Sequence, residues 1–187
     1  MGDDMKTDNM KIIFLDIDGV LNSEKSFEYY QKVGANEVMY IAPWYGHIKH
    51  VNYIIEKTGA DVVISSTWRG SYKLEMILYL AGLKGNIIGK TPHCESRIRG
   101  EEIKEFLKWM QTDDKDVEPE KRTPLYNLKK ELLDRPNYTG LKIDNFVILD
   151  DDTDMLDLVD NFVHVDSYKG LTRKDANNAI KILNGVK

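Results

Sequence analysis

The sequence is poor in cysteine and has no long apolar run, and both features exclude classes of protein. It has a single cysteine, Cys94, so no disulfide can form within the chain and a disulfide-rich secreted fold is excluded. No apolar run approaches the roughly 20 residues that a membrane-spanning helix needs. The first ten residues, MGDDMKTDNM, lack the basic and then apolar pattern of a signal peptide. We therefore expect a cytoplasmic protein with no membrane segment, in which residues 1–10 form a disordered tail.

Histidine and excess positive charge are also scarce. The four histidines show no spacing typical of a zinc site, and the net charge of -5 argues against a broad surface that coats nucleic acid. A local basic patch for a phosphorylated end is compatible with this total charge. The length of 187 residues suits one domain, which we expect to cover residues 11–187. No feature predicts a stable protein partner.

Short apolar runs alternate with segments of helical period along the chain. We predict strands at residues 11–15, 61–65, 86–89, 145–150 and 161–166, and helices at 43–58, 72–81, 101–110, 123–133 and from Thr172 onward. Thr172 and Asp175 match a capping box at the start of the last helix. The alternation is typical of βαβ units, so we predict an α/β fold with a mostly parallel sheet covered on both faces. Residues 20–42 predict a small flap, and the acidic residues 111–122 a solvated loop.

Polar residues follow four of the five predicted strands. They are Asp16, Asp18 and Gly19, then Ser65, Ser66 and Thr67, then Asp150, Asp151 and Asp152, and finally Asp166. Ligands of an open parallel sheet bind outside the carboxyl ends of the strands, so we expect these residues in one crevice. Neighbouring carboxylates repel one another unless a cation neutralises them, and oxygen ligands suit Mg²⁺ better than zinc. The sequence thus predicts a Mg²⁺ site, for which a phosphate ester is the usual substrate.

Three of these segments resemble the motifs of the haloacid dehalogenase (HAD) superfamily. FLDIDGV at residues 14–20 is similar to its first motif, VVISS at 62–66 to its second and FVILDD at 146–151 to its fourth. More narrowly, the segments VVISSTWRG, RGEEI and FVHVDSYKGLT look similar to the small HAD domain of bacterial and phage RNA-repair proteins. The resemblance implies a HAD-like Rossmannoid three-layer fold with a central parallel sheet and no large cap domain.

The resemblance also implies a role for each acidic residue. Asp16 would be the nucleophile that forms an aspartyl-phosphate, and Asp18 the general acid/base. Side chains at positions i and i+2 of an extended chain point to the same side, so both can reach one phosphoryl group. The metal ligands would be Asp16, the backbone carbonyl of Asp18, Asp150 and Asp151. Asp154 is an alternative to Asp151.

The second and third motifs are less sharply defined. Ser65, the first residue after the apolar run, would hydrogen-bond a phosphoryl oxygen. The third-motif cation, which offsets phosphate and carboxylate charge, is open among Lys90, Arg97 and Arg99. We favour Arg99 because it opens the RGEEIKEFL helix.

A further group of residues near these motifs could contact the substrate. The candidate substrate-binding residues are Ser66, Trp68, Arg69 and Arg97. A base could stack on Trp68 and a phosphate could contact Arg69, although a tryptophan at such a place also serves as partial core and an arginine as a solvated cap.

These residues predict a Mg²⁺-dependent phosphomonoester hydrolase acting on a nucleotide or a nucleic-acid terminal phosphate. About 40 residues separate the first and second motifs, too few for a large cap, which leaves an open site for bulky substrates. One alternative is a phosphatase of sugars or other small metabolites. The other is a phosphate- or Mg²⁺-binding module without turnover.

Overall fold

The computed structural model describes residues 10–32, 42–71, 73–111 and 143–186. Several predicted features lie outside these residues. They are the tail at 1–9, the second part of the flap at 33–41, the acidic loop at 112–122 and the helix at 123–133.

Five strands form one sheet. They are β1 (Met10–Leu15), β2 (Asp61–Ile64), β3 (Ile87–Lys90), β4 (Ile143–Asp150) and β5 (Phe162–His164). All neighbours pair in parallel, in the order β3-β2-β1-β4-β5. The predicted α/β class and all five predicted strands are confirmed. β1 begins at Met10, which pairs with β4 and so does not belong to a tail.

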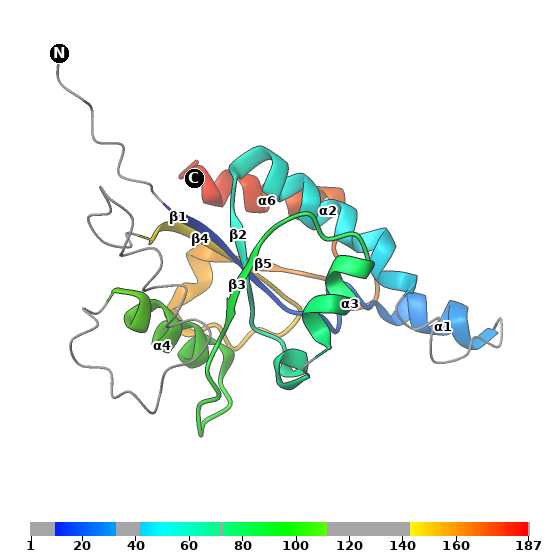
Figure 1. Ribbon diagram of the computed structural model, residues 1–187, viewed down its shortest axis with the longest axis horizontal. Coiled ribbons are helices and arrows are strands. Elements are labelled where there is room, and N and C mark those ends of the chain that lie inside the picture. The colour runs from blue at the N-terminus through cyan, green and yellow to red at the C-terminus, as the bar shows by residue number, and fades with distance from the viewer. Residues whose placement is uncertain (1–9, 33–41, 72, 112–142, 187) are drawn as a thin grey trace, which may run out of the picture.

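Helices connect the strands and cover the sheet. The α-helices are α1 (Glu24–Lys32), α2 (Ala42–Thr58), α3 (Leu74–Leu80), α4 (Arg99–Gln111) and α6 (Arg173–Leu183), and the 3-10 helices are η2 (Thr67–Gly70) and η5 (Leu156–Asn161). The sequence pattern did not predict α1, which begins within the expected flap, nor the two 3-10 helices. Figure 1 shows α2, α3 and α6 on one side of the sheet and α4 on the other. This is the predicted three-layer arrangement, and the described residues include no second domain.

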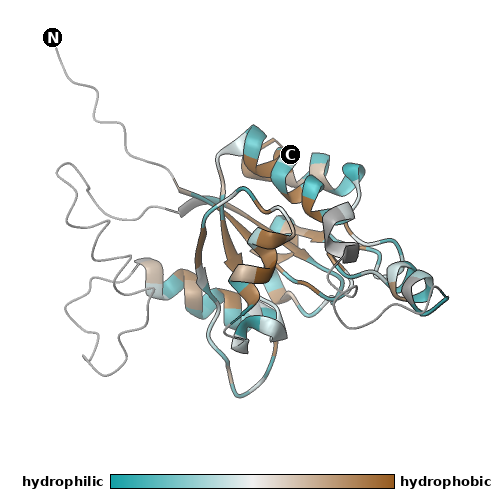
Figure 2. Ribbon diagram, turned by 45° about the vertical axis from the view of Figure 1, so that its right-hand side comes forward, coloured by the Kyte–Doolittle hydropathy of each residue, from teal (hydrophilic) through white to brown (hydrophobic). Residues whose placement is uncertain are grey.

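The alternation of side chains along β1 explains why both faces are covered. Ile13 and Leu15 are buried in the core against α2, α3 and α6, whereas Ile12 and Phe14 are buried on the opposite face against α4. All four side chains are fully buried. A strand buried on both faces has no polar side, so it reads as a continuous apolar run. Figure 2 shows the strands as hydrophobic and the covering helices as amphipathic.

The register of the sheet places the polar residues that follow the strands. Leu15, the last residue of β1, pairs with Ile64 of β2 and with Leu149 of β4. Asp16 therefore stands beside Ser65 on one side and Asp150 on the other. The order of strands also reverses between β1 and β4, which is where ligands of open α/β sheets bind. In the described part of the chain, no helix is both long and apolar enough to cross a membrane.

The predicted capping box at the start of α6 is present and allows a first test. The Thr172 hydroxyl accepts from the Asp175 amide, and the Asp175 carboxylate accepts from the Thr172 amide. We expect Thr172→Ala to lower the free energy of unfolding by about 1 kcal/mol, because an amide of the first turn loses its acceptor. Urea denaturation measures this change. Asn177→Ala, an exposed change within the same helix, should leave stability unchanged or slightly higher; equal losses in both variants would contradict the capping role.

Candidate active site

Three carboxylates meet at the carboxyl ends of β1 and β4. Asp16, Asp150 and Asp151 each offer an oxygen, and these oxygens lie within 4.8 Å of one another. Asp16 is 5% exposed and Asp150 is fully buried. Of the other carboxylates that the sequence placed beside them, Asp152 and Asp166 are exposed, and Asp166 pairs with a nearby lysine. The group is one that could hold a metal ion.

A tight turn after β1 brings the third carboxylate close. Gly19 has φ +71°, and a Cβ atom built there would lie 2.2 Å from Cγ of Asp151. The left-handed backbone and the close approach both require glycine. The glycine of the first motif therefore leaves room for Asp151 over the turn.

Asp18 lies beside this cluster but outside it. Its Oδ2 accepts from the indole Nε1 of Trp68 at 2.8 Å, and its Oδ1 accepts from Nδ2 of Asn22 at 3.2 Å. The side chain is exposed, two residues beyond Asp16. A metal contact through the Asp18 carbonyl stays a prediction.

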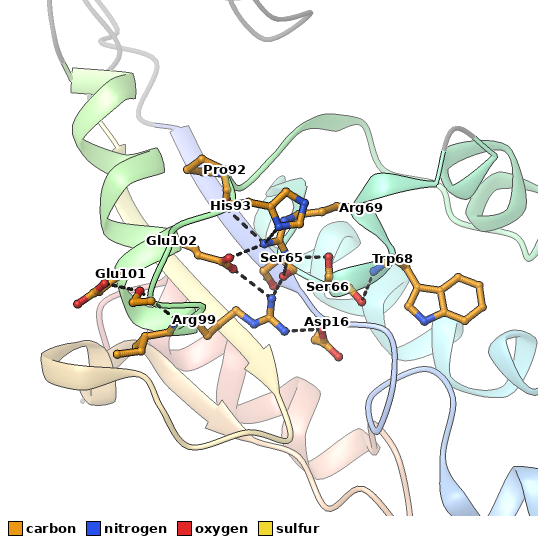
Figure 3. A network of polar contacts seen from close by, with 12 residues as sticks. Asp16, Ser65, Ser66, Trp68, Arg69, Pro92, His93, Arg99, Glu101 and Glu102 are labelled. Carbon is orange, nitrogen blue, oxygen red and sulfur yellow. Dashed lines mark hydrogen bonds and ion pairs between the residues drawn. The ribbon is translucent and has the colours of Figure 1, made fainter.

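Arg99 is the cation that the fold brings to the carboxylates (Figure 3). Its Nη2 donates to Oδ1 of Asp16 at 3.1 Å, and its Nε lies 3.0 Å from Oδ2 of Asp150. Of the other two candidates for the third motif, Lys90 pairs with Glu75 at 3.3 Å. Arg97 is exposed in a turn where its backbone is left-handed, with φ 57°.

The amino-terminal end of α4 holds Arg99 in place. The Arg99 amide donates to a carboxylate oxygen of Asp154 at 2.8 Å, and the Gly100 amide donates to the Asp154 carbonyl at 3.2 Å. Glycine is needed at position 100, since a Cβ atom there would lie 2.8 Å from the backbone of Met155. Asp154, the alternative metal ligand, thus engages the start of a helix, and Asp151 belongs to the carboxylate cluster instead.

Arg69 and Glu102 form a buried pair behind the site (Figure 3). The Arg69 guanidinium donates to the carbonyls of Ser65 and Ser66, each at 2.9 Å, and to Glu102 at 2.5 Å. The second oxygen of Glu102 lies 3.4 Å from Nη1 of Arg99. These protein acceptors engage both amino groups of Arg69, and its predicted contact with substrate stays a prediction. Sequence reasoning missed Glu102, whose only signal was its position three residues after Arg99.

The two serines after β2 differ in their surroundings. The Ser65 hydroxyl is fully buried and has no hydrogen-bond partner among the described residues. The Ser66 hydroxyl accepts from the Trp68 amide at 3.3 Å and also hydrogen-bonds Asp16, which lowers the pKa of that carboxyl. Of the two serines, Ser65 is therefore the one whose hydroxyl the described residues leave without a partner, and its contact with a phosphoryl oxygen stays a prediction.

The family of this chain follows from its similarity to known proteins. The sequence model described as the HAD domain in Swiss Army Knife RNA repair proteins matches residues 12–176. The chain belongs to this HAD domain family. The resemblance drawn from the motifs is confirmed, and the match includes every acidic residue of the site. No curated protein and no solved structure matched the chain.

Burial and mutual repulsion raise the pKa values of the acidic residues in this HAD domain. Burial, then the charge of Asp150, raise the pKa of Asp16 to about 8 against the opposing charge of Arg99. Burial raises the pKa of Asp150 to about 6, although Arg99 and the Asp152 amide oppose the shift. Burial also raises the pKa of Asp151. One arginine does not balance three carboxylates, which is the electrostatic condition for binding a further cation.

The buried Arg69–Glu102 pair gives a test of how the HAD domain is held together. We expect Glu102→Ala to lower the free energy of unfolding by about 3–5 kcal/mol, because the buried Arg69 loses the carboxylate that it pairs with. Arg99 loses one contact but keeps Asp16 and Asp150. Chemical denaturation measures the loss. Glu105→Ala, an exposed change in the same helix, should alter stability by about 0.5 kcal/mol or less. A small loss in Glu102→Ala would show that water or neighbouring groups compensate for the carboxylate.

The raised pKa of Asp16 predicts how stability depends on pH. Because the folded pKa of about 8 lies above the unfolded value of 3.8, the folded state binds more protons in this interval. The free energy of unfolding, measured in EDTA, should therefore fall as pH rises through it. Asp16→Asn should flatten this fall, and Mg²⁺ should reduce it in the wild type. The same slope in the variant would assign the effect to other groups.

Proposed function

We propose that this HAD domain is a Mg²⁺-dependent phosphomonoester hydrolase that forms an aspartyl-phosphate on Asp16. The observation that carries the proposal is the buried Asp16 carboxylate, 3.1 Å from Arg99 and within the cluster completed by Asp150 and Asp151. Asp18, an exposed acid two residues further on, supplies a second carboxyl for proton transfer. In this proposal the nucleophile and the acid follow β1, and the cation comes from the start of α4.

The donor set fits a hard divalent cation. Asp16, Asp150 and Asp151 would hold it through carboxylate oxygens, which is the ligand type that Mg²⁺ prefers. Oδ2 of Asp150 is buried, and no hydrogen bond satisfies it among the described residues, although Arg99 lies 3.0 Å away as an ion pair. When bound, Mg²⁺ would offset the charge of the carboxylates and the phosphoryl group and would keep Asp16 ionised.

The first step transfers the phosphoryl group to the protein. A carboxylate oxygen of Asp16 attacks phosphorus, the bond from phosphorus to the ester oxygen breaks, and Asp18 gives its proton to that departing oxygen. Arg99 and the Ser65 hydroxyl, whose capacity is unused, would stabilise the charge on the phosphoryl oxygens.

The second step releases phosphate. Asp18, now a carboxylate, takes a proton from water as the water oxygen attacks phosphorus of the aspartyl-phosphate. The bond between phosphorus and the Asp16 oxygen breaks, and inorganic phosphate leaves. Asp18 regains the proton that it gave up, so the residues return to their initial state.

We propose a nucleotide or a phosphorylated nucleic-acid end as the substrate. The family's description as a domain of RNA repair proteins supports this class. Trp68, which is 38% exposed, and Arg97, which is exposed, lie on segments that adjoin the site and could contact a nucleoside or its phosphates. A small sugar phosphate would make less use of such groups.

Phosphate release tests the proposal directly. The substrates are an aryl phosphate and 3'- and 5'-phosphorylated nucleotides and oligoribonucleotides, each assayed with Mg²⁺ or with EDTA. We expect Mg²⁺-dependent release, strongest on one class of nucleic-acid end, and a loss of about 10³-fold or more in Asp16→Asn, because the nucleophile is removed.

One control variant and two contrary outcomes make the test decisive. Asp157→Asn changes an exposed acid outside the cluster and should keep full activity. Faster release from sugar phosphates than from any nucleotide would favour the small-metabolite alternative. If folded wild-type protein released no phosphate from any member of the panel, the proposal of turnover would be rejected in favour of a binding module.

A further inference from the structure

The proposed mechanism leaves one contact of the site without a role. The indole Nε1 of Trp68 donates to Oδ2 of Asp18 at 2.8 Å, within a site where Asp18 must both give and take a proton. Figure 3 shows Trp68 extending from the segment after β2, on the side of Asp16 away from Glu102. The contact joins the loops that follow two different strands.

We propose that Trp68 is a positioning residue for Asp18, which it orients so that Oδ1 carries the transferred proton. The inference rests on the proposed function. An indole N–H can only donate a hydrogen bond, so the oxygen that accepts it cannot also present a proton to Trp68. In a neutral carboxyl group the carbonyl oxygen accepts a hydrogen bond more readily than the hydroxyl oxygen, so the indole favours Oδ2 as the carbonyl oxygen and Oδ1 as the oxygen that carries the proton. In the first step the Oδ1–H bond breaks as the proton passes to the leaving oxygen.

The surroundings of Oδ1 agree with this assignment. Asn22 donates to Oδ1 at 3.2 Å, a longer contact than the one from Trp68, and Oδ1 of Asn22 has no hydrogen-bond partner among the described residues. A rotation of the Asn22 amide would place its oxygen where it accepts from a protonated Asp18. Asn22 can thus hydrogen-bond Oδ1 of Asp18 in both protonation states of that carboxyl group. Trp68, which can only donate, favours one orientation of it.

The backbone that carries Trp68 is held firmly enough for such a role. The Ser66 hydroxyl caps η2 by accepting from the Trp68 amide at 3.3 Å, and the Ser71 amide donates to the Trp68 carbonyl at 2.8 Å. Arg69, fixed by Glu102, donates to the carbonyls that precede this turn. The indole is therefore presented from a segment with hydrogen bonds at both ends.

A linear free-energy test separates positioning from a general structural effect. We would measure kcat/KM of wild type and Trp68→Phe on aryl phosphates whose phenols differ in pKa, and on the best nucleotide substrate. The phenyl ring keeps an aromatic surface but removes the donor. An acidic p-nitrophenol needs little protonation to depart, whereas an alcohol needs a proton from Asp18.

We expect Trp68→Phe to lower kcat/KM about tenfold on the nucleotide and less than about twofold on p-nitrophenyl phosphate. The dependence of kcat/KM on the pKa of the leaving group should steepen accordingly. Trp109→Phe, a change late in α4 where the ring packs beside Phe106, should behave as wild type. Circular dichroism would establish that each variant is folded.

Other results would overturn the inference. Equal losses on all substrates would indicate a structural role, and unchanged kinetics in Trp68→Phe would show that the donor is dispensable. Normal kinetics in Trp68→Phe with a raised KM in Trp68→Ala would assign the ring to base stacking. A wild type that hydrolyses none of these esters would overturn the proposed function, whereas wild-type turnover lost in Asp16→Asn with no change in Trp68→Phe would overturn this inference alone.

Discussion

The balance of charge at the end of β1 and β4 is the constraint on which the site depends. Asp16 and Asp150 are buried beside each other, and Arg99 is the cation that contacts both. Buried charges are tolerated only when they are paired and hydrogen-bonded, so the position of Arg99 must itself be fixed. Asp154 fixes its backbone and Glu102 faces its guanidinium. The loop after β4 and the start of α4 are thereby tied to the carboxylates that they help to neutralise.

Arg99 alone does not neutralise the carboxylates, and the chemistry that we propose requires this imbalance. The pKa values of Asp16 and Asp150 remain raised although Arg99 lies beside both. The apo site is therefore short of positive charge, while a phosphate ester would bring more negative charge to it. In the proposed function a bound cation would offset both deficits, so that an acidic site could accept an acidic substrate. For the same reason the net charge of -5 does not indicate whether the ligand is acidic or basic.

Features that depend on the chain's own periodicity could be predicted from the sequence. The apolar run of β1 and the acids that follow it predicted the strand, its burial on both faces and the position of Asp16 at its end. Arg99 was favoured because it opens a helix, and the structure places it at the carboxylates. The arrangement of Arg69 and Glu102 could not be predicted, because it depends on where two side chains from different elements point after packing. The position of Arg69 next to the second motif suggested a contact with substrate. In the structure its buried guanidinium donates to the Ser65 carbonyl and to Glu102.

The shape of the guanidinium explains why an arginine suits position 99. Its Nη2 donates to Asp16 directly after β1, its Nε lies beside Asp150 at the end of β4, and its Nη1 contacts Ser65 after β2. A lysine would present one ammonium group on a flexible chain and could not reach three neighbouring strand ends in fixed directions. Glu102 contacts the guanidinium and Asp154 holds the backbone amide, both from outside the cluster. In the proposed reaction Arg99 would therefore keep its place while it exchanges a carboxylate partner for a phosphoryl oxygen. We infer that the cation is preorganised for the transferred group, so that little reorganisation is needed when the substrate binds.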